Sequence, residues 1–275
     1  MHRVLLLLAA LTVATGAPAS GDTRRPPRPT RIVSLNLCAD QYLLALADPG
    51  QIAGLTRFAR DSAMSAGAEK ARAMPILGGS AEEVLAVEPD LIIGTPARRS
   101  EMMGALAGRH YNMVNLPAAK SYADILDRIR TVAKAVGHPD RGETLIARMN
   151  ADLAALPRRH NAGVAAYYQR RGYLTGTGTL IDDLLTRAGL TNLAGKLGKP
   201  ALSQLSIEDL VAAQPDYILL ESASEHVVDQ GTEMLQHPAL RGIKRLRLPQ
   251  AWTVCGGPAY VRAARSLSAQ VTARR

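Results

Sequence analysis

The sequence predicts an α/β protein built from two similar lobes, each a mainly parallel sheet flanked by helices. A segment of the first half, residues 80–93, recurs in the second half as residues 206–219. Strand candidates alternate with helical patterns around both copies, which is typical of parallel sheets with helices on both faces. Between the copies lies a stretch with helical patterns only. We expect it to hold one long connector helix that joins the lobes.

Each copy of the repeat predicts a short helix, a sharp turn and a buried strand. A serine, Ser80 or Ser206, precedes the helical pattern as a cap, and glutamate occupies the first turn, where it favours the helix dipole. Pro89 and Pro215 then end the two helices, and apolar runs typical of buried strands follow. The repeat therefore predicts one such unit in each lobe.

Each lobe is also predicted to begin with a strand and a helix. Residues 31–35 and 163–168 are the strand candidates. Helical patterns follow around residues 40–47 in the first lobe and, after a glycine-containing loop, around 180–188 in the second. These units complete the expected alternation of strands and helices.

The region between the lobes predicts two helices, at residues 121–136 and 140–156, separated by Gly-His-Pro. We expect the second to be the connector helix. The predicted boundaries are 31–118 for the N-terminal lobe, 119–160 for the helical region and 161–275 for the C-terminal lobe. Because a helical connector is stiffer than strand crossovers, we expect little closure of the lobes.

The N-terminus has the layout of a secretory signal peptide. Arg3 precedes an apolar run too short to span a membrane, and small residues continue to Ala19, which predicts a signal peptide over residues 1–19. Residues 20–30 are charged and rich in proline, so they predict a flexible leader. No cysteine stands at the cleavage point for a lipid anchor. We therefore expect a soluble protein in the periplasm.

The composition is basic, with 33 Lys and Arg against 24 Asp and Glu and a formal net charge of +9. Such a balance suits nucleic acid, a membrane surface or an anionic ligand. Export argues against nucleic acid, and so does the spread of basic residues away from aromatic clusters. Most of the charge is expected on the solvated surface.

The two cysteines, Cys38 and Cys255, lie far apart in the sequence. An even number of cysteines in an exported protein favours a disulfide between them. Small cysteines beside helices are also common core residues. The sequence leaves both interpretations open.

Several features carry a resemblance to a known family. They are the strand start Arg31-Ile-Val-Ser-Leu, the Pro-Asp pairs at 89–90 and 215–216, the connector helix, and residues 252–258 before a last helix. In these the sequence resembles the periplasmic-binding family for vitamin B12 and ferric siderophores, and the resemblance covers nearly all of residues 31–270. It implies a two-lobed binding protein, not an enzyme, that holds a metal chelate, either a ferric siderophore or a corrinoid such as cobalamin. We expect a monomer without a cofactor of its own.

The resemblance also implies delivery of the ligand to an ATP-binding-cassette (ABC) permease in the inner membrane. In the family, a surface glutamate on each lobe meets arginines of the transporter. Glu82 and Glu208 match these glutamates by position, and one glutamate per lobe suits a permease with two-fold symmetry. The alternative is that both only complement the positive ends of their helices.

The ligand cleft is expected between the lobes, where loops follow the carboxyl ends of the strands. Aromatic rings there would stack on a macrocycle or catechol, and guanidinium groups would pair with carboxylates or phosphate. Trp252 also matches a cleft tryptophan of the B12-binding relatives. The candidate ligand-binding residues are Asn36, Arg57, Phe58, Thr95 and Arg98 in the first lobe, and Tyr168, Arg170, Arg171, Tyr173 and Trp252 in the second.

Other classes of function receive less support. The histidines are scattered, so a metal site made of protein side chains is not expected, and metal would arrive already chelated. The enzyme alternative rests on the glycine loop at 175–179, which precedes a helix and resembles a phosphate cradle but lacks the lysine of a nucleotide-binding loop. An exported scaffold on the same two-lobed fold predicts no small-molecule ligand.

Overall fold

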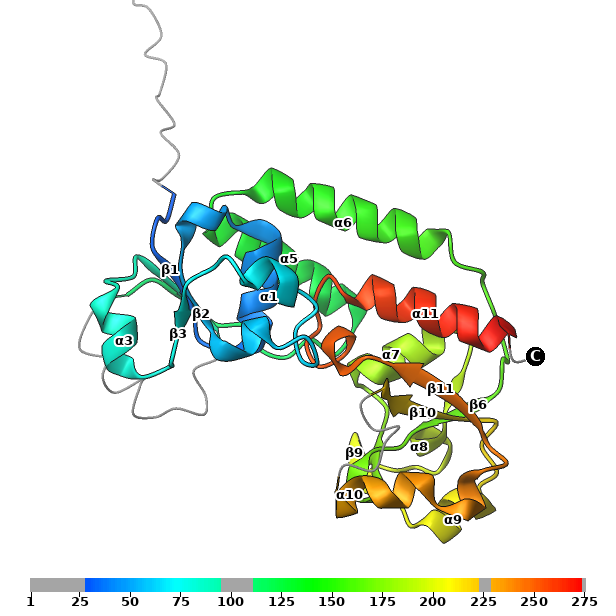
Figure 1. Cartoon of the computed structure of the whole chain (residues 1–275). Coiled ribbons are helices and arrows are strands. Elements are labelled where there is room, and N and C mark those ends of the chain that lie inside the picture. Colours follow the sequence, from blue (N-terminus) through cyan, green and yellow to red (C-terminus); the bar gives the residue numbers. More distant parts are fainter. Residues whose placement is uncertain (1–27, 95–110, 223–228, 274–275) are drawn as a thin grey trace, which may run out of the picture.

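The computed structural model describes residues 28–94, 111–222 and 229–273. Two lobes lie at either end of a set of long helices (Figure 1). Each lobe contains a parallel sheet with helices on its faces, so the predicted fold class is confirmed. Among the described residues, no helix is long and apolar enough to cross a membrane.

The N-terminal lobe contains a five-stranded parallel sheet in the order β3-β2-β1-β4-β5. Parallel strands need crossover connections, and helices provide several of them. The strands are β1 (Ile32–Ser34), β2 (Ile52–Thr56), β3 (Ile76–Leu77), β4 (Leu91–Ile93) and β5 (Met113–Val114). The helices are α1 (Leu37–Leu46), α2 (Ala68–Ala71) and α3 (Ala81–Ala86).

The C-terminal lobe contains a four-stranded parallel sheet in the order β11-β10-β6-β8. A separate antiparallel pair, β7 (Tyr173–Thr175) with β9 (Leu202–Gln204), was not expected from the sequence. The sheet strands are β6 (Val164–Tyr167), β8 (Thr191–Asn192), β10 (Tyr217–Glu221) and β11 (Lys244–Leu248). The helices are α7 (Leu180–Arg187), α8 (Leu193–Lys196), α9 (Ile207–Ala212), α10 (Gln230–Glu233) and α11 (Tyr260–Ala273).

The repeat has the same local structure in both lobes. Ser80 and Ser206 cap α3 and α9 by accepting the backbone N–H groups of Glu83 and Asp209. The residue before each proline then adopts a left-handed φ, 43° at Glu88 and 46° at Gln214, which turns the chain sharply into β4 or β10.

The aspartates that follow the repeat's prolines tie each unit to the first strand of its lobe. Asp90 accepts the backbone N–H groups of Thr30 and Arg31 at 2.7 and 2.9 Å. Asp216 likewise accepts the N–H of Val164 at 2.7 Å. Thr30 belongs to the segment expected to be flexible, so the end of that leader is anchored.

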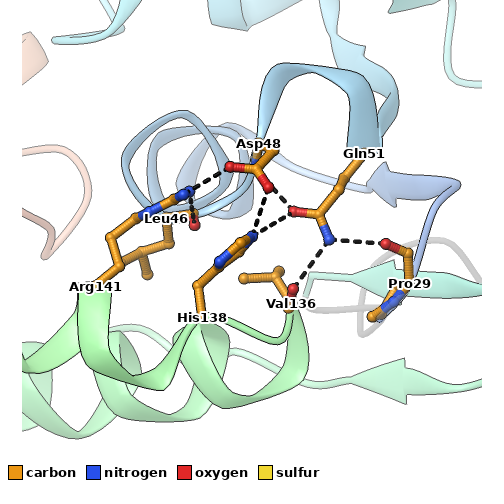
Figure 2. Close-up of polar contacts among 7 residues, drawn as sticks. All are labelled: Pro29, Leu46, Asp48, Gln51, Val136, His138 and Arg141. Carbon is orange, nitrogen blue, oxygen red and sulfur yellow. Dashed lines mark hydrogen bonds and ion pairs between the residues drawn. The ribbon is translucent and has the colours of Figure 1, made fainter. Parts of the chain in front are cut away.

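Helices α5 (Tyr122–Ala135) and α6 (Pro139–Ala154) join the lobes. A polar cluster fixes their connecting turn to the N-terminal lobe (Figure 2). Asp48 lies 2.9 Å from the ring Nε2 of His138 and 2.6 Å from the guanidinium of Arg141. The amide of Gln51 donates to the carbonyl oxygens of Pro29 and Val136.

The other end of the helical pair is fixed to the C-terminal lobe. The ring of Tyr122, at the start of α5, stacks on Tyr260 of α11 with 5.2 Å between centroids. The guanidinium of Arg187 lies over both rings, and Tyr260 donates a hydrogen bond to Asp183. Helix α6 is therefore the connector that crosses between lobes, and α5 runs back beside it.

One hydrophobic core runs through both lobes and the helices between them. It includes Ile32 and Ile93 of the first sheet, Ile129 of α5, and Leu219 and Leu246 of the second sheet. Two smaller clusters cover the outer faces of the sheets. Since the main core is continuous, the lobes share one packed interior.

Candidate ligand-binding cavity

A cavity of about 740 Å³ lies between the lobes, within the size range of small-molecule sites. The N-terminal lobe lines it with residues that follow the ends of β1, β2 and β3, and with residues 116–119. The C-terminal lobe contributes the start of α7 and residues 253–256. Most lining side chains are apolar, so the cavity suits a ligand with a large hydrophobic surface.

The Cys38–Cys255 disulfide forms part of the cavity wall. It joins α1 to the loop before α11, with 5.2 Å between the Cα atoms, and thus links the two lobes covalently. One turn further along α1, the hydroxyl of Tyr42 donates to the carbonyl oxygen of Gly256. Burial raises the pKa of Tyr42, so this hydroxyl keeps its proton.

The described lining is basic. Arg57 and Arg128 line the cavity, and no Asp or Glu does so among the residues with a described position. The guanidinium of Arg57 lies 4.9 Å from the centroid of the Phe58 ring, whose side chain is 40% exposed. Arg128 donates to the carbonyl oxygen of Ala118 at 3.1 Å.

Two helices from opposite lobes begin at the cavity. Asn36 caps α1 by accepting the N–H of Ala39 at 2.9 Å, and Thr179 caps α7 by accepting the N–H of Asp182 at 3.3 Å. Helix N-termini carry partial positive charge. Aspartates in the first turns, Asp40 in α1 and Asp182 and Asp183 in α7, offset this charge. The two arginines are therefore the groups of the lining that favour negative charge.

Asp40 lies buried behind the cavity wall. Its carboxylate accepts the backbone N–H of Thr56 at 3.0 Å and the Thr56 hydroxyl at 2.5 Å. Burial raises the pKa of Asp40 to about 6, although the hydrogen bonds from Thr56 and Ser34 act in the opposite direction. Both of these partners line the cavity. The protonation state of Asp40 is therefore coupled to two residues of the wall.

The structure brings together three of the predicted N-terminal residues. Asn36, Arg57 and Phe58 all line the cavity. Thr95 and Arg98 lie outside the described residues.

Of the predicted C-terminal residues, Tyr168 is the clear correction. Its side chain is fully buried in the outer core of the C-terminal lobe, and its hydroxyl donates to the carbonyl oxygen of Leu205 at 2.8 Å. An antiparallel bridge to Leu174 turns it inward. Burial also raises its pKa to about 12. The prediction that Tyr168 contacts ligand is therefore wrong.

The other C-terminal candidates do not line the cavity. Arg170 pairs with Asp229 beside α10, and Arg171 is exposed. Tyr173 is 39% exposed at the start of β7. Trp252 is half-buried against the main core, directly before the lining residues 253–256. Their ligand-binding roles stay predictions.

Sequence reasoning missed several lining residues, among them Met64, Arg128 and the segments 77–79, 116–119 and 179–181. Residues 78–79 follow the carboxyl end of β3, where ligand-binding loops are expected. The sequence did not predict this strand, because β3 has only two residues and shows no strand pattern. Arg128 is helical, and only packing brings it to the cavity.

The glycine loop at 175–179 has a structural explanation. Thr179 caps α7, and a Cβ atom at Gly176 would lie only 2.2 Å from the carbonyl oxygen of Pro200. Glycine is therefore required for close approach of two chain segments. In the described part of the chain, no group of three or more His, Cys, Asp or Glu residues is arranged to hold a metal ion.

Comparison with known proteins identifies the family. The model of the family described as periplasmic binding protein matches residues 32–247. The chain belongs to this family. The two lobes, the helical connection and the interlobe cavity are thus the binding-protein architecture, and the predicted family resemblance is confirmed.

Individual members of the periplasmic binding protein family are more distant. A cobalamin-binding protein of Halobacterium salinarum is 23% identical over 262 residues, covering 80% of this chain and 69% of its own. A periplasmic heme-binding protein from Roseiflexus sp. RS-1 is 25% identical with a TM-score of 0.64, covering 90% of this chain and 99% of its own. The vitamin B12 binding protein of Vibrio cholerae is 16% identical with a TM-score of 0.62 and the same coverage.

Proposed function

We propose that this protein is the periplasmic solute-binding component of an ABC importer. Its interlobe cavity captures one metal chelate and presents it to an inner-membrane permease. The chelate is a heme, a ferric siderophore or a corrinoid, which includes the ligands named for the relatives. The observation that carries the proposal is a large, mostly apolar cavity lined by both lobes of a periplasmic binding protein.

The lining favours a chelate with negative charge. Two arginines line the cavity, and no carboxylate does so among the described residues. In a site of low polarity, guanidinium groups bind carboxylates strongly, whereas neutral chelates gain less from them. Phe58 supplies an exposed aromatic face against which a macrocycle or catechol would stack.

The direct test is isothermal titration calorimetry of the exported chain. The titrants are hemin, a ferric catecholate, a ferric hydroxamate and cyanocobalamin, with an amino acid and a sugar as negative controls. We expect one chelate to bind per chain with micromolar affinity or tighter, and without chemical turnover. Heat from the amino acid or the sugar alone would overturn the ligand class, and turnover of a chelate would favour an enzyme.

A substitution locates the ligand in the cavity. Phe58→Ala should weaken chelate binding several-fold to about tenfold, because a stacked ring contributes on the order of 1 kcal/mol beyond its buried area. Leu197→Ala is the matched control, since Leu197 has similar exposure but does not line the cavity. Equal affinities of the two variants would argue against ligand contact at Phe58.

A further inference from the structure

The Cys38–Cys255 disulfide joins the two lobes at the interlobe cavity itself. Cys38 is the second residue of α1 in the N-terminal lobe, and Cys255 lies in the C-terminal lobe in the loop before α11. Both cysteines line the cavity. The bond therefore lies where a bound ligand would contact it, rather than in the interior of either lobe.

The residues around Cys255 form a stretch of cavity wall without regular secondary structure. We call residues 253–256 the clamp segment, and all four of them line the cavity. The backbone N–H groups of Thr253 and Val254 both donate to the carbonyl oxygen of Gln250 at 2.9 Å. These bonds stay within the same loop, so they do not hold the segment against the N-terminal lobe.

Two contacts from one face of α1 attach the clamp segment to the N-terminal lobe. The first is the disulfide at Cys38, and the second is the hydroxyl of Tyr42, one helical turn further, which donates to the carbonyl oxygen of Gly256. The segment also packs closely against the loop before α5, because a Cβ atom at Gly256 would lie 2.4 Å from the Cβ atom of Ala119. Without the disulfide, the Tyr42 hydrogen bond would remain as the polar contact from α1.

The two sulfur atoms differ in their surroundings. Cys38 is half-buried, whereas Cys255 is only 2% exposed. We therefore expect a thiolate of a dithiol reductant to attack the Sγ of Cys38, which forms a mixed disulfide and releases Cys255 as a thiolate. The second thiol of the reductant then displaces Cys38. The reductant leaves as a disulfide after giving up two electrons, and both cysteines take up a proton.

We propose that the Cys38–Cys255 disulfide is a redox-sensitive clamp on the ligand cavity. The oxidised form holds the clamp segment against α1 in the position that binds the chelate, and reduction by a dithiol loosens the segment and weakens binding. This inference rests on the proposed function. Coupling between two events is reciprocal, so a disulfide that favours ligand binding is itself favoured by the ligand, by the same factor. A disulfide with only a stabilising role lacks this coupling.

Calorimetry on the full exported chain compares the oxidised protein with protein reduced by dithiothreitol. The probes are cyanocobalamin and the gallium(III) forms of protoporphyrin, a catecholate and a hydroxamate, because thiols do not reduce gallium(III). We expect the reduced protein to bind its preferred probe about five- to tenfold more weakly. Equal affinities would overturn the clamp and leave the proposed function intact, whereas no binding of any probe to the oxidised protein would overturn both.

The reciprocal measurement uses the unmodified protein in a dithiothreitol redox buffer. Thiol trapping and mass spectrometry give the fractions of disulfide and dithiol, with and without a saturating amount of the same probe. The probe should shift the equilibrium towards the disulfide by the factor that separates the two affinities. An equilibrium that does not respond to the probe would show that the disulfide and the cavity are not coupled, and would overturn the proposal.

Two variants separate the clamp from general stability. Cys38→Ser/Cys255→Ser should bind the probe as weakly as the reduced protein, and dithiothreitol should not change its affinity. Leu210→Ala is the control, since Leu210 is buried in the outer core of the C-terminal lobe, does not line the cavity, and its truncation lowers stability. It should keep the affinity of the unmodified protein. Equal losses in Leu210→Ala and the double variant would assign the effect to destabilisation and contradict the clamp.

Discussion

At the scale of single residues, Asp40 shows how a buried charge is coupled to the cavity wall. It anchors Thr56, the residue before Arg57 and Phe58, through two hydrogen bonds. Burial nevertheless favours its protonated form and raises its pKa from 3.8 to about 6. The folded protein therefore binds this proton more tightly than the unfolded chain does.

The consequence is a pH dependence with a defined sign. Stability contributed by Asp40 is fully present below about pH 4 and is lost as the pH rises through about 6, because the carboxylate must then ionise while buried. Asp40→Asn keeps groups that can bond to Thr56 and cannot ionise. As the pH rises from 4 to 7.5, the free energy of unfolding of Asp40→Asn should therefore increase relative to that of the unmodified protein, by on the order of 3 kcal/mol.

Urea unfolding across this pH range measures the difference. The exposed Asp127→Asn variant serves as the control and should follow the unmodified protein. If the free energies of unfolding of Asp40→Asn and of the unmodified protein changed with pH by the same amount, Asp40 would not cause the pH dependence of stability.

At the scale of elements, helices α3 and α9 place one exposed glutamate at the same position in each lobe. Glu82 and Glu208 are the second residues of their helices and are exposed, whereas the capping contacts involve Glu83 and Asp209. Helix-start contacts with its own backbone N–H and with Ser80 lower the pKa of Glu82. Glu82 is thus charged, and both exposed side chains are available for an interface.

We predict that Glu82→Arg and Glu208→Arg leave chelate affinity unchanged but reduce uptake, and that the double variant is the most impaired. This expectation rests on the proposed transport function. Charge reversal against a basic surface replaces attraction by repulsion, which can cost several kcal/mol at an interface. Transport into vesicles reconstituted with the cognate permease is the measurement.

Two controls separate docking from helix stability. Melting curves of the variants detect the few tenths to about 1 kcal/mol that arginine costs at a helix N-terminus. Glu233→Arg changes a first-turn glutamate of α10 outside the repeat and should transport normally. Full transport by the double variant would leave Glu82 and Glu208 with a helix-start role only.

At the scale of the whole molecule, the lobes are joined by helices, a continuous core and a disulfide. Polar clusters fix the helical pair at both ends, around Asp48 and around Tyr122. The Cys38–Cys255 bond then closes most of the chain into one loop, with a sequence separation of 217 residues. These connections favour a stiff arrangement of the lobes.

Loss of the disulfide should lower stability strongly. In Cys38→Ser/Cys255→Ser we expect the free energy of unfolding to fall by roughly 2–5 kcal/mol, chiefly because the unfolded chain is no longer constrained. Denaturant unfolding with and without a phosphine reductant is the measurement. The reductant should destabilise the unmodified protein and leave the stability of the double variant unchanged. Equal free energies of unfolding for the two proteins without reductant would contradict the prediction.

The sequence by itself determined the repeated unit, the alternation of strands and helices, and the entry of Asn36, Arg57 and Phe58 into the site. These features are local, since caps, turn residues and apolar runs act over a few neighbouring positions. A loop after a parallel strand is also directed to one edge of the sheet by the strand alone. The position of such a loop can therefore be predicted without knowing which distant residues contact it.

Only the tertiary structure decided the C-terminal half of the site. Tyr168 turns into the core because the chain after β6 folds back through Leu174, and β7 then pairs with β9 about 30 residues later. The arrival of Arg128 at the interlobe cavity depends on how whole helices pack. Strand pairing and helix packing join residues far apart in the chain, and so no local pattern of residue types encodes them.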